Sequence, residues 1–114
     1  DDEWGGVNQV HLLANGCLGI LGHISRMSEG DVRHYYGMTF CFDPKQMSIS
    51  GLKIICERKD FPNSKLKRPD LEDVIFPGGL VRKDDGKAEI SAGLSDASAG
   101  FALIEDPFIE YENL

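Results

Sequence analysis

An acidic residue in a loop of small side chains is the first candidate for chemistry in this chain. Asp96 follows a predicted strand over residues 87–94 and stands between Ser95 and Ala97. A carboxylate in such a loop accepts hydrogen bonds from the hydroxyl groups of a sugar. The alternative is a turn aspartate that bonds its own backbone, and the residues alone favour this second interpretation.

A histidine and several aromatic residues extend the set of candidates. His23 lies at the end of an apolar predicted strand over residues 17–24, where a histidine usually has a structural role. Its imidazole can also donate a hydrogen bond to an anionic oxygen. Trp4, Tyr35 and Tyr36 offer rings on which a sugar face can stack, although packing in the core or at its rim is the commoner role of such rings.

Basic residues gather within residues 53–68, although the formal net charge of the whole chain is -7. Arg58, Lys67 and Arg68 are the candidates for binding a phosphate or carboxylate group, because arginine pairs bidentately with such anions and lysine adds a point charge. The segment has no glycine-rich phosphate loop, and a solvated loop is the alternative interpretation. The acidic total argues against a general nucleic-acid binder and against binding to anionic membrane surfaces.

Several other chemistries are not indicated. Cys17, Cys41 and Cys56 form no metal-binding pattern with one another or with histidine, so we expect no metal, no cofactor, and buried reduced thiols in a cytoplasmic protein. No serine–histidine–aspartate arrangement is recognisable, and Ser95 beside Asp96 lacks the glycine-flanked elbow of many hydrolases. The apolar runs are far too short to cross a membrane.

The elements that must position these residues are almost all strands. Hydrophobic alternation and turn residues predict seven of them, over residues 7–13, 17–24, 33–42, 52–57, 74–82, 87–94 and 100–104. Asn15-Gly16 and Asp85-Gly86 predict tight hairpin turns, and residues 77–79 predict a bulge. At most a single helical turn is expected, near residues 44–48 or 95–99.

The order of the elements is four strands, a long irregular loop over residues 59–72, and three further strands. This order fits an all-β protein with four-stranded antiparallel blades, as in a β-propeller. The first four strands would form one complete blade, and the last three a final blade that lacks its closing strand. A small β-sandwich also accounts for seven strands. The count alone leaves both architectures open.

The motifs resemble the last blade of the mannoside phosphorylases, glycoside hydrolase family 130. The resemblance rests on VIFPGGLV at residues 74–81, the Asp85-Gly86 turn, and AGLSDA at residues 92–97. Upstream, LGILGH at residues 18–23 and FCFDP at residues 40–44 are similar to two earlier strands of that family. The order and the spacing agree over most of the chain.

A closer resemblance is to an uncharacterised propeller family, the domain of unknown function 1861 type, within the wider β-fructosidase-like propeller clan. The shared motifs are EWGG at residues 3–6, LGHI at 21–24, HYY at 34–36, KRPDL at 67–71, SDA at 95–97 and DPF at 106–108. These motifs span nearly the whole chain. The resemblance supplies a fold and no assigned activity.

The two resemblances together imply the C-terminal part of a five-bladed β-propeller. They imply one blade over about residues 1–58, a connecting loop over 59–72, and a last blade over 73–114. The implied function is that of a glycoside phosphorylase or hydrolase acting on a mannoside or a related glycoside, with inorganic phosphate as a co-substrate. The implied partners are a carbohydrate ligand and the remainder of the same polypeptide.

The resemblance also implies roles for particular residues. Asp96 corresponds to an aspartate of the sugar subsite, and His23 to a histidine that lines the phosphate and sugar site. The family's proton-donating aspartate belongs to an earlier blade, outside this chain. Where the phosphorylases have tyrosines before Asp96, this chain has Ser91 and Ala92. That difference favours the alternative of a non-catalytic carbohydrate-binding or structural propeller.

Overall fold

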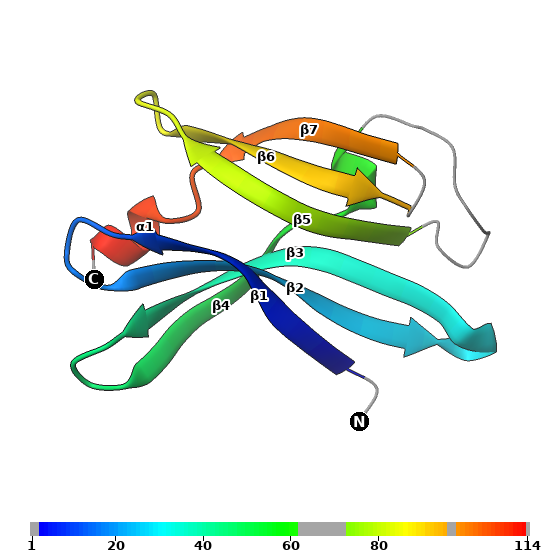
Figure 1. The fold of residues 1–114 in the computed structure, drawn as a ribbon, viewed down its shortest axis with the longest axis horizontal. Coiled ribbons are helices and arrows are strands. Elements are labelled where there is room, and N and C mark those ends of the chain that lie inside the picture. The colour runs from blue at the N-terminus through cyan, green and yellow to red at the C-terminus, as the bar shows by residue number, and fades with distance from the viewer. Residues whose placement is uncertain (1–2, 62–72, 96–97, 114) are drawn as a thin grey trace.

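The computed structural model describes residues 3–61, 73–95 and 98–113. Seven strands in these residues form one sheet (Figure 1). They are β1 (Glu3–Leu12), β2 (Leu18–Ser28), β3 (Val32–Asp43), β4 (Ser48–Cys56), β5 (Asp73–Arg82), β6 (Lys87–Leu94) and β7 (Ser98–Glu105). Each covers or overlaps one of the predicted strands, so the all-β class is confirmed.

The sheet has two antiparallel parts. Strands β1 to β4 pair in sequence order, and strands β5 to β7 do the same. A short parallel pairing joins the two parts, His34 with Asp73 and Tyr35 with Val74. In Figure 1 strands β5 to β7 lie above strands β1 to β4. The division of the chain into a blade and part of a second blade stays a prediction.

The hairpin turns form where the residues predict them. Gly16 and Gly86 have φ angles of 85° and 83°, which residues with a side chain rarely adopt. The carboxylate of Asp85 accepts a hydrogen bond from the backbone N–H of Lys87 at 3.1 Å, a common way to close such a turn. The predicted bulge is also present, because the β5–β6 register shifts between Pro77 and Gly79.

The core lies between the two parts of the sheet. Strand β6 alternates strictly, with Ala88, Ile90, Ala92 and Leu94 buried, so one of its faces packs inward. The other members of the core come mainly from β2, β3, β5 and the C-terminal segment; they include Leu13, Leu21, Cys41, Cys56, Phe61, Ile75, Leu80, Phe108 and Tyr111. Burial of this apolar set is the main source of stability.

A short helix, α1 (Ile109–Glu112), closes one end of the core. The helical turn predicted near residues 44–48 was wrong, because residues 44–47 form the turn between β3 and β4. Helix α1 forms instead after Asp106, whose carboxylate accepts a hydrogen bond from the backbone N–H of Phe108 at 2.9 Å. The hydroxyl of Tyr111 donates to the carbonyl of Gly51 at 2.6 Å, which ties α1 to β4.

Charged groups fasten α1 to β5. The Arg82 guanidinium donates to the Asp106 carboxylate at 2.7 Å and to the Glu112 carboxylate at 2.6 Å. The backbone N–H of Ala14 also donates to Glu112, at 2.8 Å. The bonds from Arg82 and Ala14 lower the pKa of Glu112 to about 2.

The three cysteines are free, and Cys41 and Cys56 are buried while Cys17 is half-buried. Burial raises the pKa of the Cys56 thiol to about 12, so this group stays protonated at neutral pH. The prediction of buried thiols is therefore confirmed for Cys41 and Cys56.

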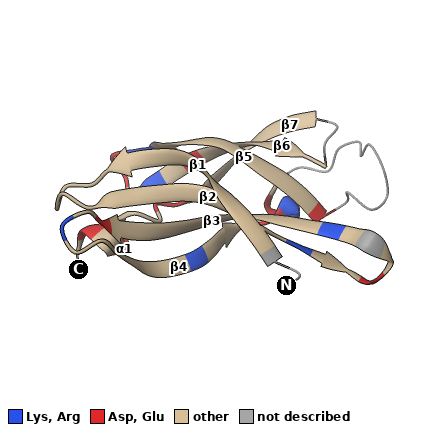
Figure 2. Ribbon diagram, turned by 60° about the horizontal axis from the view of Figure 1, so that its bottom comes forward, with Lys and Arg blue, Asp and Glu red and all other residues tan. Residues whose placement is uncertain are grey.

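Several large apolar side chains lie on open faces of the sheet. Figure 2 shows that long stretches of β1 and β2 carry no charged residues. The exposed apolar residues on β1 and β4 are Val7, Val10, Leu12, Ile49, Leu52 and Ile54, and those on β5 and β7 are Phe76, Val81, Phe101 and Leu103. No helix among the described residues is long and apolar enough to cross a membrane.

Candidate functional site

Strands β2 and β3 bring together two of the predicted site residues. His23 pairs with Gly37, and Tyr35 lies two residues before Gly37 in β3, on the same face of the strand. The His23 and Tyr35 rings are stacked, with centroids 6.1 Å apart and planes inclined by 14°. Antiparallel strands place diagonal neighbours on one face within reach of aromatic side chains, which explains the contact.

Two more rings complete an aromatic cluster of Trp4, His23, Tyr35 and Phe76. Phe76, from β5, lies 4.6 Å from the His23 ring and 6.2 Å from the Tyr35 ring. Trp4, from β1, meets Tyr35 edge to face at 5.9 Å. Trp4 is 42% exposed and Phe76 48% exposed, so the cluster presents ring faces to solvent. Such half-exposed rings are suited to stacking on a flat apolar face.

The protonation of His23 follows from its neighbours. Its Nδ1 lies 2.9 Å from the side-chain oxygen of Asn8, which only accepts, so Nδ1 carries the proton. Burial lowers the pKa of His23 below 6.5, which keeps the ring neutral near pH 7. Its Nε2 is then an acceptor. Gly6 gives the ring room, because a Cβ at this position would lie 3.2 Å from His23 Cε1.

We predict that His23 titrates with a midpoint below 6.5, measured by NMR of the imidazole in the full-length protein. The folded-state pKa is lowered from 6.5, so protonation favours the unfolded state, and the stability linked to His23 is lost as pH falls below 6.5. His23→Gln identifies the resonance by removing it. A midpoint at or above 6.5 would contradict the half-buried, neutral ring.

Arg58 lies beside the residue that precedes Asp96. Its side chain is buried, and its Nε donates to the hydroxyl of Ser95 at 3.0 Å. The backbone N–H of Ser95 in turn donates to the carbonyl of Val74 at 2.7 Å. Arg58 therefore holds the end of β6, from which the Asp96 loop leaves. Anion binding by Arg58 stays a prediction.

Asp96, Lys67 and Arg68 lie outside the described residues. The end of β6 is nonetheless placed, because Gly93 pairs with Phe76 of the aromatic cluster. The last residues of β6 therefore lie close to that cluster.

Tyr36 does not belong to the aromatic cluster. Successive residues of a strand point to opposite faces, so Tyr36 lies on the other side of β3 from Tyr35. Its hydroxyl donates to the Asp73 carboxylate at 2.5 Å, and burial together with Asp73 raises its pKa to about 12. Tyr36 therefore lies apart from Trp4 and Tyr35, and stacking of its ring on a sugar stays a prediction.

Sequence reasoning missed Phe76 and Asn8 as site residues. Phe76 stands in the FPGG motif, but its place beside His23 depends on how β5 crosses the β1–β4 part. Asn8 lies at the irregularity in the β1–β2 register, which no local pattern marks. Among the described residues, no group of three or more histidine, cysteine or acidic side chains is arranged to hold a metal ion.

The fold and the aromatic cluster define an all-β protein with a half-exposed site between two packed parts of a sheet. Residues 1–110 match the family described as "Protein of unknown function (DUF1861)", and the chain belongs to this family. No match was found among curated protein sequences.

Solved structures give a more detailed likeness. The chain is similar to MPT-4, a mannose phosphorylase from Leishmania mexicana in complex with phosphate ion, with a TM-score of 0.89 and 35% identity over 97% of this chain and 36% of that one. It is similar to MPT-1, a GDP-Man-dependent mannosyltransferase from Leishmania mexicana, with a TM-score of 0.84 and 32% identity over 94% of this chain and 36% of that one.

A hypothetical protein from Leishmania major is also similar, with a TM-score of 0.85 and 37% identity over 93% of this chain and 35% of that one. The chain therefore spans little more than a third of the length of these structures.

Proposed function

We propose that this chain forms part of a carbohydrate-active propeller that acts on a mannoside or related glycoside, as a phosphorylase or a hydrolase. The observation that carries the proposal is the aromatic cluster, with its neutral His23, beside the end of β6. The likeness to a mannose phosphorylase and a mannosyltransferase over nearly the whole chain supports the mannoside class.

The residues have complementary roles in this proposal. The exposed rings of Trp4 and Phe76 stack on the apolar face of a sugar, and His23 Nε2 accepts a hydrogen bond from one of its hydroxyl groups. Asp96 accepts further hydroxyl protons. Arg58, Lys67 and Arg68 supply positive charge for a phosphate that attacks the anomeric carbon. The acid that protonates the leaving oxygen comes from outside this chain.

The same proposal gives the chain a place in a larger architecture. We take residues 1–58, 59–72 and 73–114 as one blade, a connection and the last blade of a five-bladed propeller. The apolar residues exposed on β1, β4, β5 and β7 support this, because isolated domains rarely leave such faces in solvent. The remainder of the polypeptide would cover them. The free cysteines support a cytoplasmic location.

One observation favours a carbohydrate-binding propeller without catalysis. Ala92 is buried in the core, and the Ser91 hydroxyl donates to the carbonyl of Gly79 at 3.4 Å. Neither side chain replaces the tyrosines that the phosphorylases carry before their aspartate. A protein that had kept the stacking rings and lost part of the reaction site would show this pattern. A structural propeller is the third alternative.

The test uses the full-length protein with a panel of mannosides and glucosides, with and without phosphate. Sugar 1-phosphate formed only with phosphate identifies a phosphorylase, and free sugar formed regardless of phosphate identifies a hydrolase. Asp96→Asn should lower kcat/KM by about tenfold to a hundredfold, the worth of a charge-assisted hydrogen bond. Asp84→Asn, in the exposed β5–β6 turn, is the matched control.

The other outcomes separate the alternatives. Binding of mannosides by calorimetry without turnover means the non-catalytic propeller. If the protein neither turns over nor binds any member of the panel, the proposed carbohydrate function is overturned.

A further inference from the structure

A serine, a histidine and an aspartate form a hydrogen-bonded chain on the face of β3 opposite the aromatic cluster. Ser28 Oγ lies 2.8 Å from His34 Nε2, and His34 Nδ1 lies 2.7 Å from an Asp73 carboxylate oxygen. Tyr36 donates to that same oxygen at 2.5 Å. The three residues come from three different strands, and Asp73 is 39 positions from His34, so the spacing of residues gave no sign of the set.

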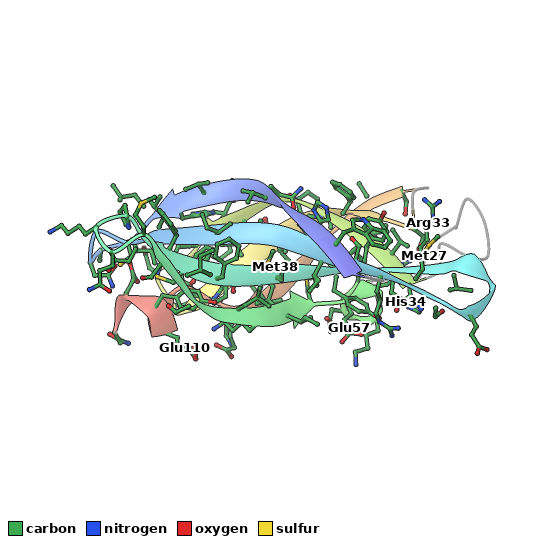
Figure 3. The ribbon with its side chains drawn as sticks, turned by 90° about the horizontal axis from the view of Figure 1, so that it is seen from below. Met27, Arg33, His34, Met38, Glu57 and Glu110 are labelled. Atoms are coloured by element: carbon green, nitrogen blue, oxygen red, sulfur yellow. The ribbon has the colours of Figure 1, made fainter. Side chains whose placement is uncertain are left out.

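The strand register explains the convergence. Ser28 is the last residue of β2, and His34 lies on the same face of β3 two residues beyond its partner Val32. Asp73 is the first residue of β5 and pairs directly with His34. Figure 3 shows His34 toward the end of the sheet that carries the β2–β3 hairpin. The site therefore depends on the parallel joint between the two parts of the sheet.

These hydrogen bonds have the arrangement in which a histidine activates a serine hydroxyl. A carboxylate only accepts, so His34 Nδ1 carries its proton toward Asp73 and, in the neutral ring, Nε2 is an acceptor. In that tautomer the Ser28 hydroxyl is the donor to Nε2. Ser28 precedes a short helical turn (Glu29–Asp31), yet its side chain makes no capping bond to that turn. Its hydroxyl is directed to His34 in place of the backbone partner that serine usually takes there.

A small cavity lies on the same face of the sheet. It measures about 70 Å³ and is lined by Ile24, Ser25, Arg26, Tyr36 and Ile54. Tyr36 belongs both to this cavity and to the hydrogen-bonded chain, and Arg26 pairs with His34 across the strands. This pocket is partly open and smaller than a cavity that holds benzene, so its size suits a short acyl chain. Arg26 adds a cationic group of the kind that stabilises a developing oxyanion.

We propose that Ser28 is the nucleophile of an acyl-transfer site, with His34 as its base, Asp73 as the residue that orients His34, and a short-chain carboxylic ester as substrate. Ser28 Oγ bonds to the ester carbonyl carbon while its proton passes to His34 Nε2. The carbon–oxygen bond to the leaving alcohol then breaks, and the alcohol takes that proton. Water, deprotonated by His34, cleaves the acyl-serine and restores the hydroxyl.

The exposure of the three residues is compatible with such a site. Ser28 is half-exposed, and the side chains of His34 and Asp73 are 16% and 33% exposed. A test on the full-length protein therefore examines both reactivity and access.

The experiment treats the full-length protein with a fluorophosphonate probe and maps the adduct by mass spectrometry. The expected result is one adduct, on Ser28, that is absent in Ser28→Ala. His34→Gln should slow labelling by about a hundredfold or more, the usual contribution of a general base. Ser50→Ala, which removes an exposed hydroxyl on β4, should label at the rate of the unchanged protein.

Turnover supplies an independent measurement. The protein should release p-nitrophenol from p-nitrophenyl acetate faster than from the octanoate, and Ser28→Ala should lose this preference and the catalysed rate. Circular dichroism shows that each variant is folded before it is compared. Labelling that misses Ser28, or that proceeds equally fast without His34, would overturn the proposal and leave a polar cluster that only fastens the hairpin to β5.

Discussion

Replacing Phe108 with alanine should lower the free energy of unfolding by about 3–5 kcal/mol, the usual cost of removing a buried aromatic ring. Phe108 is fully buried and lies where several elements meet. Its ring is 4.9 Å from the ring of His11 in β1 and 6.2 Å from that of Tyr111 in α1. A Cβ at Gly19 would lie 2.7 Å from it, so the packing is tight. The measurement is urea unfolding of the full-length protein, followed by circular dichroism.

Phe101→Ala is the matched comparison, because the Phe101 side chain on β7 is 66% exposed in this structure. If β7 stayed in solvent, the loss of this ring would cost less than about 0.5 kcal/mol; because the propeller proposal covers β7 with other parts of the polypeptide, we expect a larger cost in the full-length protein. A cost near that of Phe108→Ala would mean that other parts of the polypeptide cover β7, as the propeller proposal requires. A Phe108→Ala variant as stable as the unchanged protein would refute the account of the core.

Replacing Arg82 with alanine should destabilise the fold by about 3 kcal/mol, since removing one partner of a buried ion pair leaves the other charge uncompensated. The Asp106 side chain is only 3% exposed and would lose its cationic partner without Arg82. We expect a loss of stability at the lower end of the range usual for buried ion pairs, because Arg82 itself is 26% exposed. Lys87→Ala is the control: its ion pair with Glu105 is exposed on both sides, and such pairs contribute little.

The same variant should change the response to acid. The pKa of Glu112 falls from 4.5 to about 2 on folding, so its contribution to stability is complete above pH 4.5 and is lost as pH falls toward 2. In Arg82→Ala this part of the pH dependence should largely disappear. Unfolding curves at pH 6 and at pH 3 measure it, and an unchanged difference between the two would count against the role of Arg82.

The sequence predicted most of the fold because strands and hairpin turns have local signals. Residues 87–94 alternate so regularly that the prediction and strand β6 coincide. Strand β4 begins at Ser48, earlier than predicted. The prediction missed its first residues because they are exposed and lack an apolar alternation. Helix α1 has a single turn and follows a turn closed by the Asp106 carboxylate, neither of which periodicity reveals.

The candidate site was predictable only where strand neighbours are close in sequence. His23 and Tyr35 meet because one hairpin sets their register, and a sequence that specifies the hairpin specifies the contact. Phe76 joins them from a strand that arrives after a long connection. The pairing of His34 with Asp73 likewise depends on a parallel contact between residues 39 positions apart. Non-local contacts of this kind have no signature in the local pattern.

The narrow joint between β3 and β5 has a mechanical consequence. Among the described residues this parallel joint consists of two residue pairs, His34 with Asp73 and Tyr35 with Val74. Packed side chains, rather than backbone hydrogen bonds, therefore set the angle between the two parts of the sheet. Three rings of the aromatic cluster belong to strands β1 to β3, and the fourth, Phe76, belongs to β5. The ring centroids of His23 and Phe76 lie 4.6 Å apart, so this contact joins the two parts of the sheet. A molecule that stacked on both rings would contact both parts of the sheet and so resist a change in the angle between them.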